Sequence, residues 1–299
     1  MADIGRLITA MVTPFDGEGD VDYAQARRLA QALLASGSDG VAVAATTGEG
    51  PSLSHDEKLR LFTEVKEVVG QRGAVIANVG TYNTRESIEM AREAEKLGVD
   101  GLLLTVPYYN RPTQEGIYRH FEAIAGSTTL PCILYNIPGR TGTNMTAETA
   151  IRLSQVPNIA GVKEASGNLE QIGRIIAGAG EAFRVWSGND SDTLPILASG
   201  GYGVICVVSH LAGLQMKEMM ESFLIGRVRE AARCHLRLLS LMSVLMTAAT
   251  NPIPVKYALN VVGFGVGAPR LPLVEPDEAA AQKIRAEVQR HRVDLPVAV

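Results

Sequence analysis

Short apolar runs alternate with longer amphipathic segments through most of the chain. The apolar runs are 7–13, 41–46, 74–80, 101–107, 131–137, 159–164, 183–187 and 203–208. They are nearly continuously apolar, which is typical of parallel strands whose faces are covered by helices. The segments between them, at 23–36, 55–71, 84–97, 114–125, 146–154, 169–177 and 192–199, have the apolar spacing of amphipathic helices.

Several of the expected helices also carry end signals. Ser54 and Glu57 form an S-x-x-E capping box at the start of one helix. Gly70 and Gly98 stand where two helices are expected to end. The positions of these residues agree with the boundaries that the apolar spacing gives.

This alternation predicts an α/β protein with a closed (β/α)8 TIM barrel. An open doubly wound sheet is the alternative, but such sheets usually have fewer strands. After Gly226 the strand patterns stop and helical patterns take over, with no low-complexity linker between the two parts. We therefore expect a catalytic barrel over 1–226 and a C-terminal helical region over 227–299 that packs on the barrel.

The composition suits a globular enzyme more than a nucleic-acid or membrane protein. Of 299 residues, 46% are hydrophobic and 20% charged, and the net charge is 28 − 32 = −4. Without a basic cluster, neither nucleic acid nor an anionic membrane is an expected partner. The apolar segment 238–250 is too short to span a bilayer.

Cysteines and histidines give no sign of a metal site or a disulfide framework. The three cysteines, Cys132, Cys206 and Cys234, are far apart and form no CxxC pair. The five histidines are scattered without ligand spacing. We expect no metal and no other cofactor, and a reducing cytoplasmic location.

Two polar residues at the ends of apolar runs are the strongest indication of catalytic chemistry in the sequence. Lys163 ends the run 159–162, and Tyr135 ends the run 131–134. A buried lysine in its neutral form can attack a ketone and form a Schiff base, and a nearby phenol can move the protons that this needs. Taken alone, Lys163 could instead pair with Glu164 at the surface, and Tyr135 could be a core residue whose hydroxyl binds the backbone.

Other strand ends add polar residues of less certain meaning. Thr46 and Thr47 could hold a substrate or only cap the turn before Gly48. Tyr108 and Tyr109 are each, when taken alone, typical of aromatic residues that pack in the protein or at an interface. Arg140 suits a carboxylate substrate, although an arginine in such a loop is ordinarily solvated.

The assembled motifs resemble the dihydrodipicolinate synthase family, within the pyruvate-dependent class I aldolases. The similarity runs from about residue 7 to residue 272. Its motifs are Thr-Thr-Gly-Glu at 46–49, Pro-Tyr-Tyr-Asn-Arg-Pro at 107–112, Tyr-Asn-Ile-Pro-Gly-Arg-Thr-Gly at 135–142, Gly-Val-Lys-Glu-Ala at 161–165 and Asn-Pro-Ile-Pro-Val-Lys at 251–256. Together they are specific for the superfamily, and Arg140 narrows the choice within it.

The resemblance implies a cofactor-free condensation of pyruvate with L-aspartate 4-semialdehyde, an early step of lysine and diaminopimelate synthesis. Lys163 matches the Schiff-base lysine and Tyr135 the proton donor and acceptor. Thr46 links that phenol to Tyr109, which in the family reaches into a neighbouring subunit. The implied assembly is a homotetramer built as a dimer of dimers.

Further positions match substrate contacts. Thr47 and Ile205 match positions that hold pyruvate, and Arg140 the position that binds the carboxylate of the semialdehyde. The rivals with the same chemistry are N-acetylneuraminate lyase, 2-keto-3-deoxygluconate aldolase and 4-hydroxy-2-oxoglutarate aldolase. Arg140 argues against the sugar-acid enzymes, whose corresponding loop normally lacks it. A non-catalytic protein that binds pyruvate or an amino acid is the alternative of another class.

A possible regulatory site departs from the lysine-inhibited members of the family. The matching residues are His55, Glu86 and Tyr108, and the departing ones are Pro51, Lys58 and Tyr82. Sensitive enzymes tend to carry histidine where Lys58 stands and asparagine where Tyr82 stands. Because a resident lysine repels an incoming ammonium, we expect weak or absent feedback inhibition by lysine.

Overall fold

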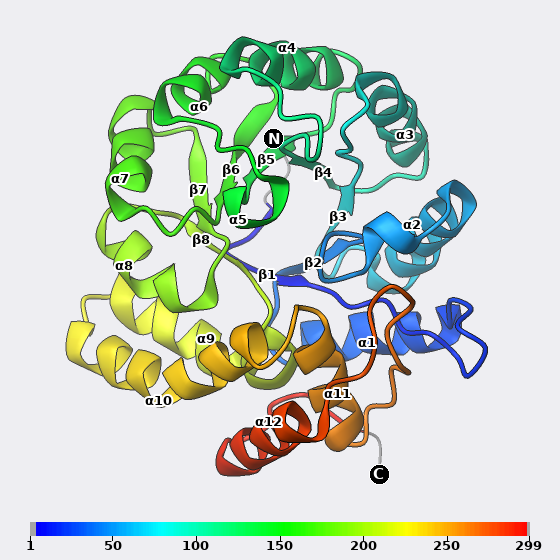
Figure 1. Cartoon of the computed structure of the whole chain (residues 1–299). Helices are drawn as coiled ribbons and strands as arrows, with labels where there is room; N and C mark the ends of the chain where they lie inside the picture. Colours follow the sequence, from blue (N-terminus) through cyan, green and yellow to red (C-terminus); the bar gives the residue numbers. More distant parts are fainter. Residues whose placement is uncertain (1–3, 298–299) are drawn as a thin grey trace. The chain divides into compact units, whose positions relative to one another are not determined.

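Eight parallel strands form a closed barrel in the order β1 to β8 (Figure 1). The structure, a computed structural model, describes residues 4–297. The strands are β1 Leu7–Ala10, β2 Gly40–Val43, β3 Ala74–Asn78, β4 Gly101–Thr105, β5 Cys132–Asn136, β6 Ile159–Glu164, β7 Arg184–Ser187 and β8 Gly203–Cys206. The predicted (β/α)8 barrel is confirmed, and each strand lies within the apolar run that predicted it, except that β2 begins one residue earlier, at Gly40.

The helices follow the strands as the amphipathic segments predicted. They are α1 Tyr23–Ala35, α2 His55–Val69, α3 Thr84–Lys96, α4 Gln114–Ala125, α5 Pro138–Thr141, α6 Ala147–Leu153, α7 Leu169–Gly178, α8 Thr193–Ala198, α9 Ser209–Leu224, α10 Val228–Thr247, α11 Ile253–Val261 and α12 Glu278–Arg290, with short 3-10 turns η1 Gly50–Ser52 and η2 Asp190–Asp192. The segment around Arg140, expected to be a loop, contains the single helical turn α5. Helix α9 lies outside the ranges that the spacing predicted.

Side chains at the helix starts explain why the helices begin where they do. The capping box of α2 is present, because the Ser54 hydroxyl accepts from the backbone of Glu57 and the Glu57 carboxylate accepts from that of Ser54. Asn83 and Thr113 cap α3 and α4 because their side-chain oxygens accept backbone N–H groups of the first helical turn. Each cap satisfies amide groups that the first helical turn leaves without partners.

By contacts between its residues the chain divides into two compact units. Unit 1 contains Met1–Arg6 and Ile76–Ile205, and unit 2 contains Leu7–Val75 and Cys206–Val299. This division rests on contacts within each unit. The sequence, by contrast, predicted a boundary at residue 226. That boundary stays a prediction.

Unit 1 contains the run of strands from β4 to β7. Strand β5 pairs with β4 on one side and with β6 on the other, and β6 pairs with β7, all in parallel. These strands are buried along almost their whole length, and Trp186 of β7 is fully buried. Such burial on both faces explains why their sequences are continuously apolar.

Unit 2 contains the first strand pair and the C-terminal helices. Strands β1 and β2 are paired in parallel, and α1 packs on α2. Helices α9 and α10 pack together, and α12 packs on both α10 and α11 (Figure 1). The C-terminal part described here is helical, as predicted for the region after Gly226. Among residues 4–297, no helix is both long and apolar enough to cross a membrane.

Candidate functional site

Lys163 and Tyr135 lie side by side near the ends of adjacent strands. The register of β5 and β6 places the two residues opposite each other. Lys163 Nζ lies 4.2 Å from the centroid of the Tyr135 ring, and the two residues are 4% and 3% exposed. The predicted amine–phenol pair is therefore formed by strand register, inside the protein.

Glu164, the alternative partner of Lys163, binds other groups. Successive side chains of a strand point to opposite faces, which separates the two residues. The Glu164 carboxylate accepts from the amides of Asn136 at 3.0 Å and Gln171 at 3.3 Å and from the backbone N–H of Ser166 at 2.8 Å. Burial raises the pKa of Glu164, and these donors oppose the shift. In the described residues, no ion pair joins Lys163 to Glu164.

The loop after β4 carries two tyrosines in very different surroundings. Tyr109 is 91% exposed, and its φ of 70° is a left-handed conformation that costs a non-glycine residue free energy. Tyr108 is half-buried and packs edge-on against Tyr82, with ring centroids 5.2 Å apart. Burial raises the pKa of Tyr108, with smaller contributions from Tyr82 and Glu86. Three of the possible regulatory residues, Tyr82, Glu86 and Tyr108, thus influence one another within unit 1.

The other residues of unit 1 that were predicted to bind substrates differ in exposure. Arg140 lies on α5 and is exposed. Ile205 lies in β8 and is fully buried. The exposed guanidinium can reach a soluble anion, whereas the isoleucine contributes apolar surface or backbone groups.

In unit 2, the loop after β2 forms a tight turn around Thr46 and Thr47. The Thr46 carbonyl accepts from the N–H of Glu49 at 3.1 Å. A Cβ on Gly50 would collide with the carbonyl oxygen of Ala44, so only glycine fits there. Thr46 is partly buried, and Thr47 is 3% exposed. Both hydroxyls are thereby placed by a backbone that has little freedom.

Three further residues of the possible regulatory set also lie in unit 2. Pro51 is exposed in η1, and His55 is exposed at the start of α2. Lys58 lies one turn later and is partly buried. All three follow the turn that carries Thr46 and Thr47.

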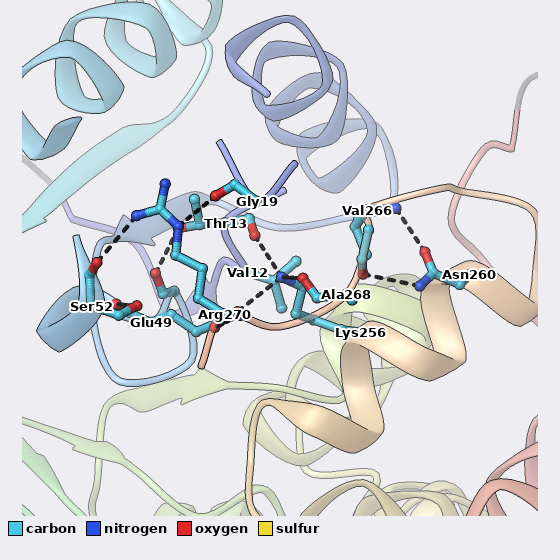
Figure 2. Close-up of polar contacts among 12 residues, drawn as sticks. Val12, Thr13, Gly19, Glu49, Ser52, Lys256, Asn260, Val266, Ala268 and Arg270 are labelled. Carbon is cyan, nitrogen blue, oxygen red and sulfur yellow. Dashed lines mark hydrogen bonds and ion pairs between the residues drawn. The ribbon is translucent and has the colours of Figure 1, made fainter. Parts of the chain in front are cut away.

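The sequence missed the residues that hold this turn. Asn251 donates its side-chain N–H to Thr47 Oγ1 at 3.0 Å. Lys256 pairs with Glu49 at 2.8 Å, with side chains 1% and 2% exposed (Figure 2). These residues belong to the motifs at 46–49 and 251–256, but nothing in either motif shows that the two segments contact each other.

Lys256 is saturated with partners. Its ammonium donates to Glu49 Oε1 at 2.8 Å and to the carbonyls of Thr13 at 3.1 Å and Ala268 at 3.0 Å, so each of its three hydrogens has an acceptor. Burial lowers the pKa of Lys256, and the charge of Glu49 opposes that shift. The other oxygen of Glu49 accepts from the N–H of Arg270 at 2.9 Å (Figure 2).

No group of three or more His, Cys, Asp and Glu residues within 4–297 is arranged to hold a metal ion. The fold and the Lys163–Tyr135 pair define the class: an α/β protein with a (β/α)8 barrel that carries a buried amine beside a phenol on adjacent strands.

The chain belongs to the dihydrodipicolinate synthetase family, whose model matches residues 3–291. A 4-hydroxy-tetrahydrodipicolinate synthase of Dehalococcoides mccartyi is 57% identical over 99% of this chain and 100% of its own length. The crystal structure of a dihydrodipicolinate synthase from Bacillus anthracis has a TM-score of 0.94 and 42% identity, over 97% of this chain and 99% of that one. The enzyme of Cyanidioschyzon merolae, solved with lysine bound, has a TM-score of 0.94 and 47% identity, over 96% and 98%. The family predicted from the motifs is confirmed.

Proposed function

We propose that the protein is a lyase that condenses pyruvate with L-aspartate 4-semialdehyde and yields 4-hydroxy-tetrahydrodipicolinate. The single observation that carries the proposal is the buried Lys163 amine beside the Tyr135 phenol. The similar proteins named as synthases of this compound support the substrates and the product. A binding protein would have no use for this pair, because binding a 2-oxo acid needs no nucleophile.

Lys163 is the nucleophile of the proposed reaction. Its neutral Nζ attacks the ketone carbon of pyruvate, and loss of water gives a Schiff base. The iminium draws electrons from the neighbouring carbon, so the methyl group loses a proton and becomes an enamine. The enamine carbon forms the new bond to the aldehyde carbon, and the aldehyde oxygen takes up a proton. The amine of the semialdehyde then attacks the iminium carbon, and departure of Lys163 Nζ closes the ring of the product and restores the free lysine amine.

Tyr135 supplies and removes the protons of these steps. Its position beside the amine suits transfer to the oxygen that leaves as water and to the aldehyde oxygen. Thr46 and Tyr109 are proposed, from the family resemblance, as the relay to this phenol. The exposure of Tyr109 in the single chain supports a role outside its own protomer. We therefore propose the homotetramer, a dimer of dimers, as the working assembly.

The other assigned residues bind substrates. Thr47 and Ile205 hold pyruvate, and Arg140 binds the carboxylate of the semialdehyde through its planar fork of donors. The exposure of Arg140 supports this role, because a soluble substrate must reach it. This arginine also favours the proposed aldehyde over the sugar acids of related aldolases.

The proposal also includes the domain organisation and the cellular location of the protein. The barrel is assigned to 1–226 and the packed helical region to 227–299. The cysteines Cys132, Cys206 and Cys234 are buried and form no disulfide, which supports a reducing cytoplasmic location.

Borohydride reduction in the presence of pyruvate, followed by mass spectrometry, tests the chemistry. The expected product is a single pyruvate adduct on Lys163, and its absence would favour the binding protein.

Tyr135→Phe should form product on the order of 10² to 10⁴ times more slowly, since a general acid–base group is lost. Condensation with aspartate semialdehyde should exceed cleavage of sugar acids, and the reverse result would select a related aldolase.

A further inference from the structure

Asn251 touches the proposed pyruvate residue Thr47 although it lies far away in the sequence. Its side-chain N–H donates to Thr47 Oγ1 at 3.0 Å, and both residues are buried. Within residues 4–297, the Thr47 hydroxyl makes no other hydrogen bond. The hydrogen of this hydroxyl is therefore still available to an acceptor.

The direction of that hydrogen follows from the chemistry of the two groups. A hydroxyl has one hydrogen to donate and two lone pairs that accept, whereas an amide nitrogen only donates. Since Asn251 occupies a lone pair of Thr47 Oγ1, the Thr47 hydrogen must point away from Asn251. An ionised carboxylate is the strongest acceptor that a small 2-oxo acid offers to such a donor.

We propose that Asn251 is a positioning residue for the first substrate: it orients the Thr47 hydroxyl so that its hydrogen is donated to the carboxylate of pyruvate. The inference rests on the proposed function, in which Thr47 binds pyruvate. It adds a residue that acts through Thr47 and that the sequence motifs alone do not assign.

A buried ion pair keeps the two segments in place. Glu49 follows Thr47 by two positions, and Lys256 follows Asn251 by five. Their side chains meet at 2.8 Å, and the N–H of Arg270 binds the second oxygen of Glu49 at 2.9 Å (Figure 2). The backbone of Glu49 is left-handed, with a φ of 54°, and these contacts hold it there. A shift of either segment would have to break a buried, hydrogen-bonded charge pair.

Two substitutions at Asn251 test the direction of the hydroxyl. Asn251→Asp replaces the donor by acceptors, so the Thr47 hydrogen turns toward residue 251 and is lost to pyruvate. The KM for pyruvate should rise at least about tenfold, the effect of losing a hydrogen bond to a charged group. Asn251→Ala frees the hydroxyl without adding charge and should raise this KM about threefold. The KM for the aldehyde should stay near that of the unmodified enzyme.

A double variant separates positioning from general support of the fold. If Asn251 acts through the hydroxyl, Asn251→Ala should have no further effect on the KM for pyruvate once Thr47→Val is present. The matched control is Asn260→Asp on α11. Asn260 donates to the Gly267 carbonyl at 3.1 Å and accepts from the N–H of Val266 at 2.8 Å (Figure 2). This control should lower stability and leave the KM for pyruvate unchanged.

The outcomes distinguish a failure of the inference about Asn251 from a failure of the proposed function. An unchanged KM for pyruvate in a folded Asn251→Asp protein, or an equal effect of Asn251→Ala with and without Thr47→Val, overturns the inference. Should Asn251→Asp fail to fold, the alanine pair decides alone. If the unmodified enzyme forms no pyruvate adduct on borohydride reduction, the proposed function itself fails.

Discussion

Two buried lysines lie in two regions of this molecule and are held in opposite ways. Lys163 of unit 1 is 4% exposed and lies over the Tyr135 ring, with no carboxylate paired to it among residues 4–297. Lys256 of unit 2 is 1% exposed and has an acceptor for each of its three hydrogens. An ammonium whose three hydrogens all have acceptors has a structural role. An amine without such acceptors remains available for reaction.

The neighbourhoods of the two lysines differ in the same way. Tyr135 faces Lys163 because two adjacent strands are in register, so local pairing is enough to form the pair. Glu49 meets Lys256 only because the turn after β2 and helix α11 pack together. The first arrangement depends on the barrel itself, and the second depends on a contact between distant segments.

The same substitution at both lysines should have the largest and most different effects. Lys163→Met should abolish the pyruvate adduct and lower the rate of product formation on the order of 10³-fold or more, since the nucleophile is lost. Its free energy of unfolding should change by no more than about 1 kcal/mol, because no ion pair is broken. Kinetics and urea denaturation of the same preparation check both parts, and a large loss of stability would contradict the distinction.

Lys256→Met should act mainly on stability. Removing one partner leaves Glu49 buried and unpaired, which destabilises the fold by about 3–5 kcal/mol. Glu49→Gln should cost less, since its amide oxygen still accepts from the ammonium. In the double variant Glu49→Gln/Lys256→Met, part of the loss should be recovered, because no unpaired charge remains. Additive losses in a urea-denaturation cycle would mean that the pair does not act as a unit.

Each unit also contains a buried histidine that is neutral, His120 in unit 1 and His210 in unit 2. Burial lowers the pKa of His120 and of His210 from 6.5 to about 4. The backbone N–H of Val12 donates to His210 Nε2 at 3.2 Å, which requires that nitrogen to be deprotonated.

Because both folded pKa values lie below the unfolded value, their stabilising contribution is complete above pH 6.5 and is lost as the pH falls toward 4. The loss should approach about 3 kcal/mol for each histidine. Denaturation at pH 7, 5.5 and 4 measures it. His120→Leu should flatten the part of this dependence that comes from unit 1 and leave the part that comes from His210. An unchanged slope would show that His120 does not contribute.

The smallest expected effect is on regulation. Free lysine should inhibit weakly or not at all, because the ammonium of Lys58 would repel the ammonium of an incoming lysine. Half-inhibition at sub-millimolar lysine would contradict this expectation. Lys58→His is the matched variant, and it should increase any sensitivity that exists.

The barrel and its central amine–phenol pair could be predicted from the sequence. Continuous apolar runs and helical spacing between them determine a parallel sheet covered by helices, and end-of-strand positions place Lys163 and Tyr135. These features depend on the period of side chains along a strand and on parallel register, which are local. The family motifs add the remaining assigned residues in chain order without any distance between them.

Which charged residues have a partner for every hydrogen or lone pair depends on packing between distant segments. Nothing local tells that Lys256 meets Glu49, or that Asn251 donates to Thr47, because these partners lie more than two hundred positions apart. The exclusion of Glu164 from Lys163 also came from its neighbours, Asn136 and Gln171. A side chain's charge is read from its type, but its partners are set by packing between segments that the sequence keeps apart.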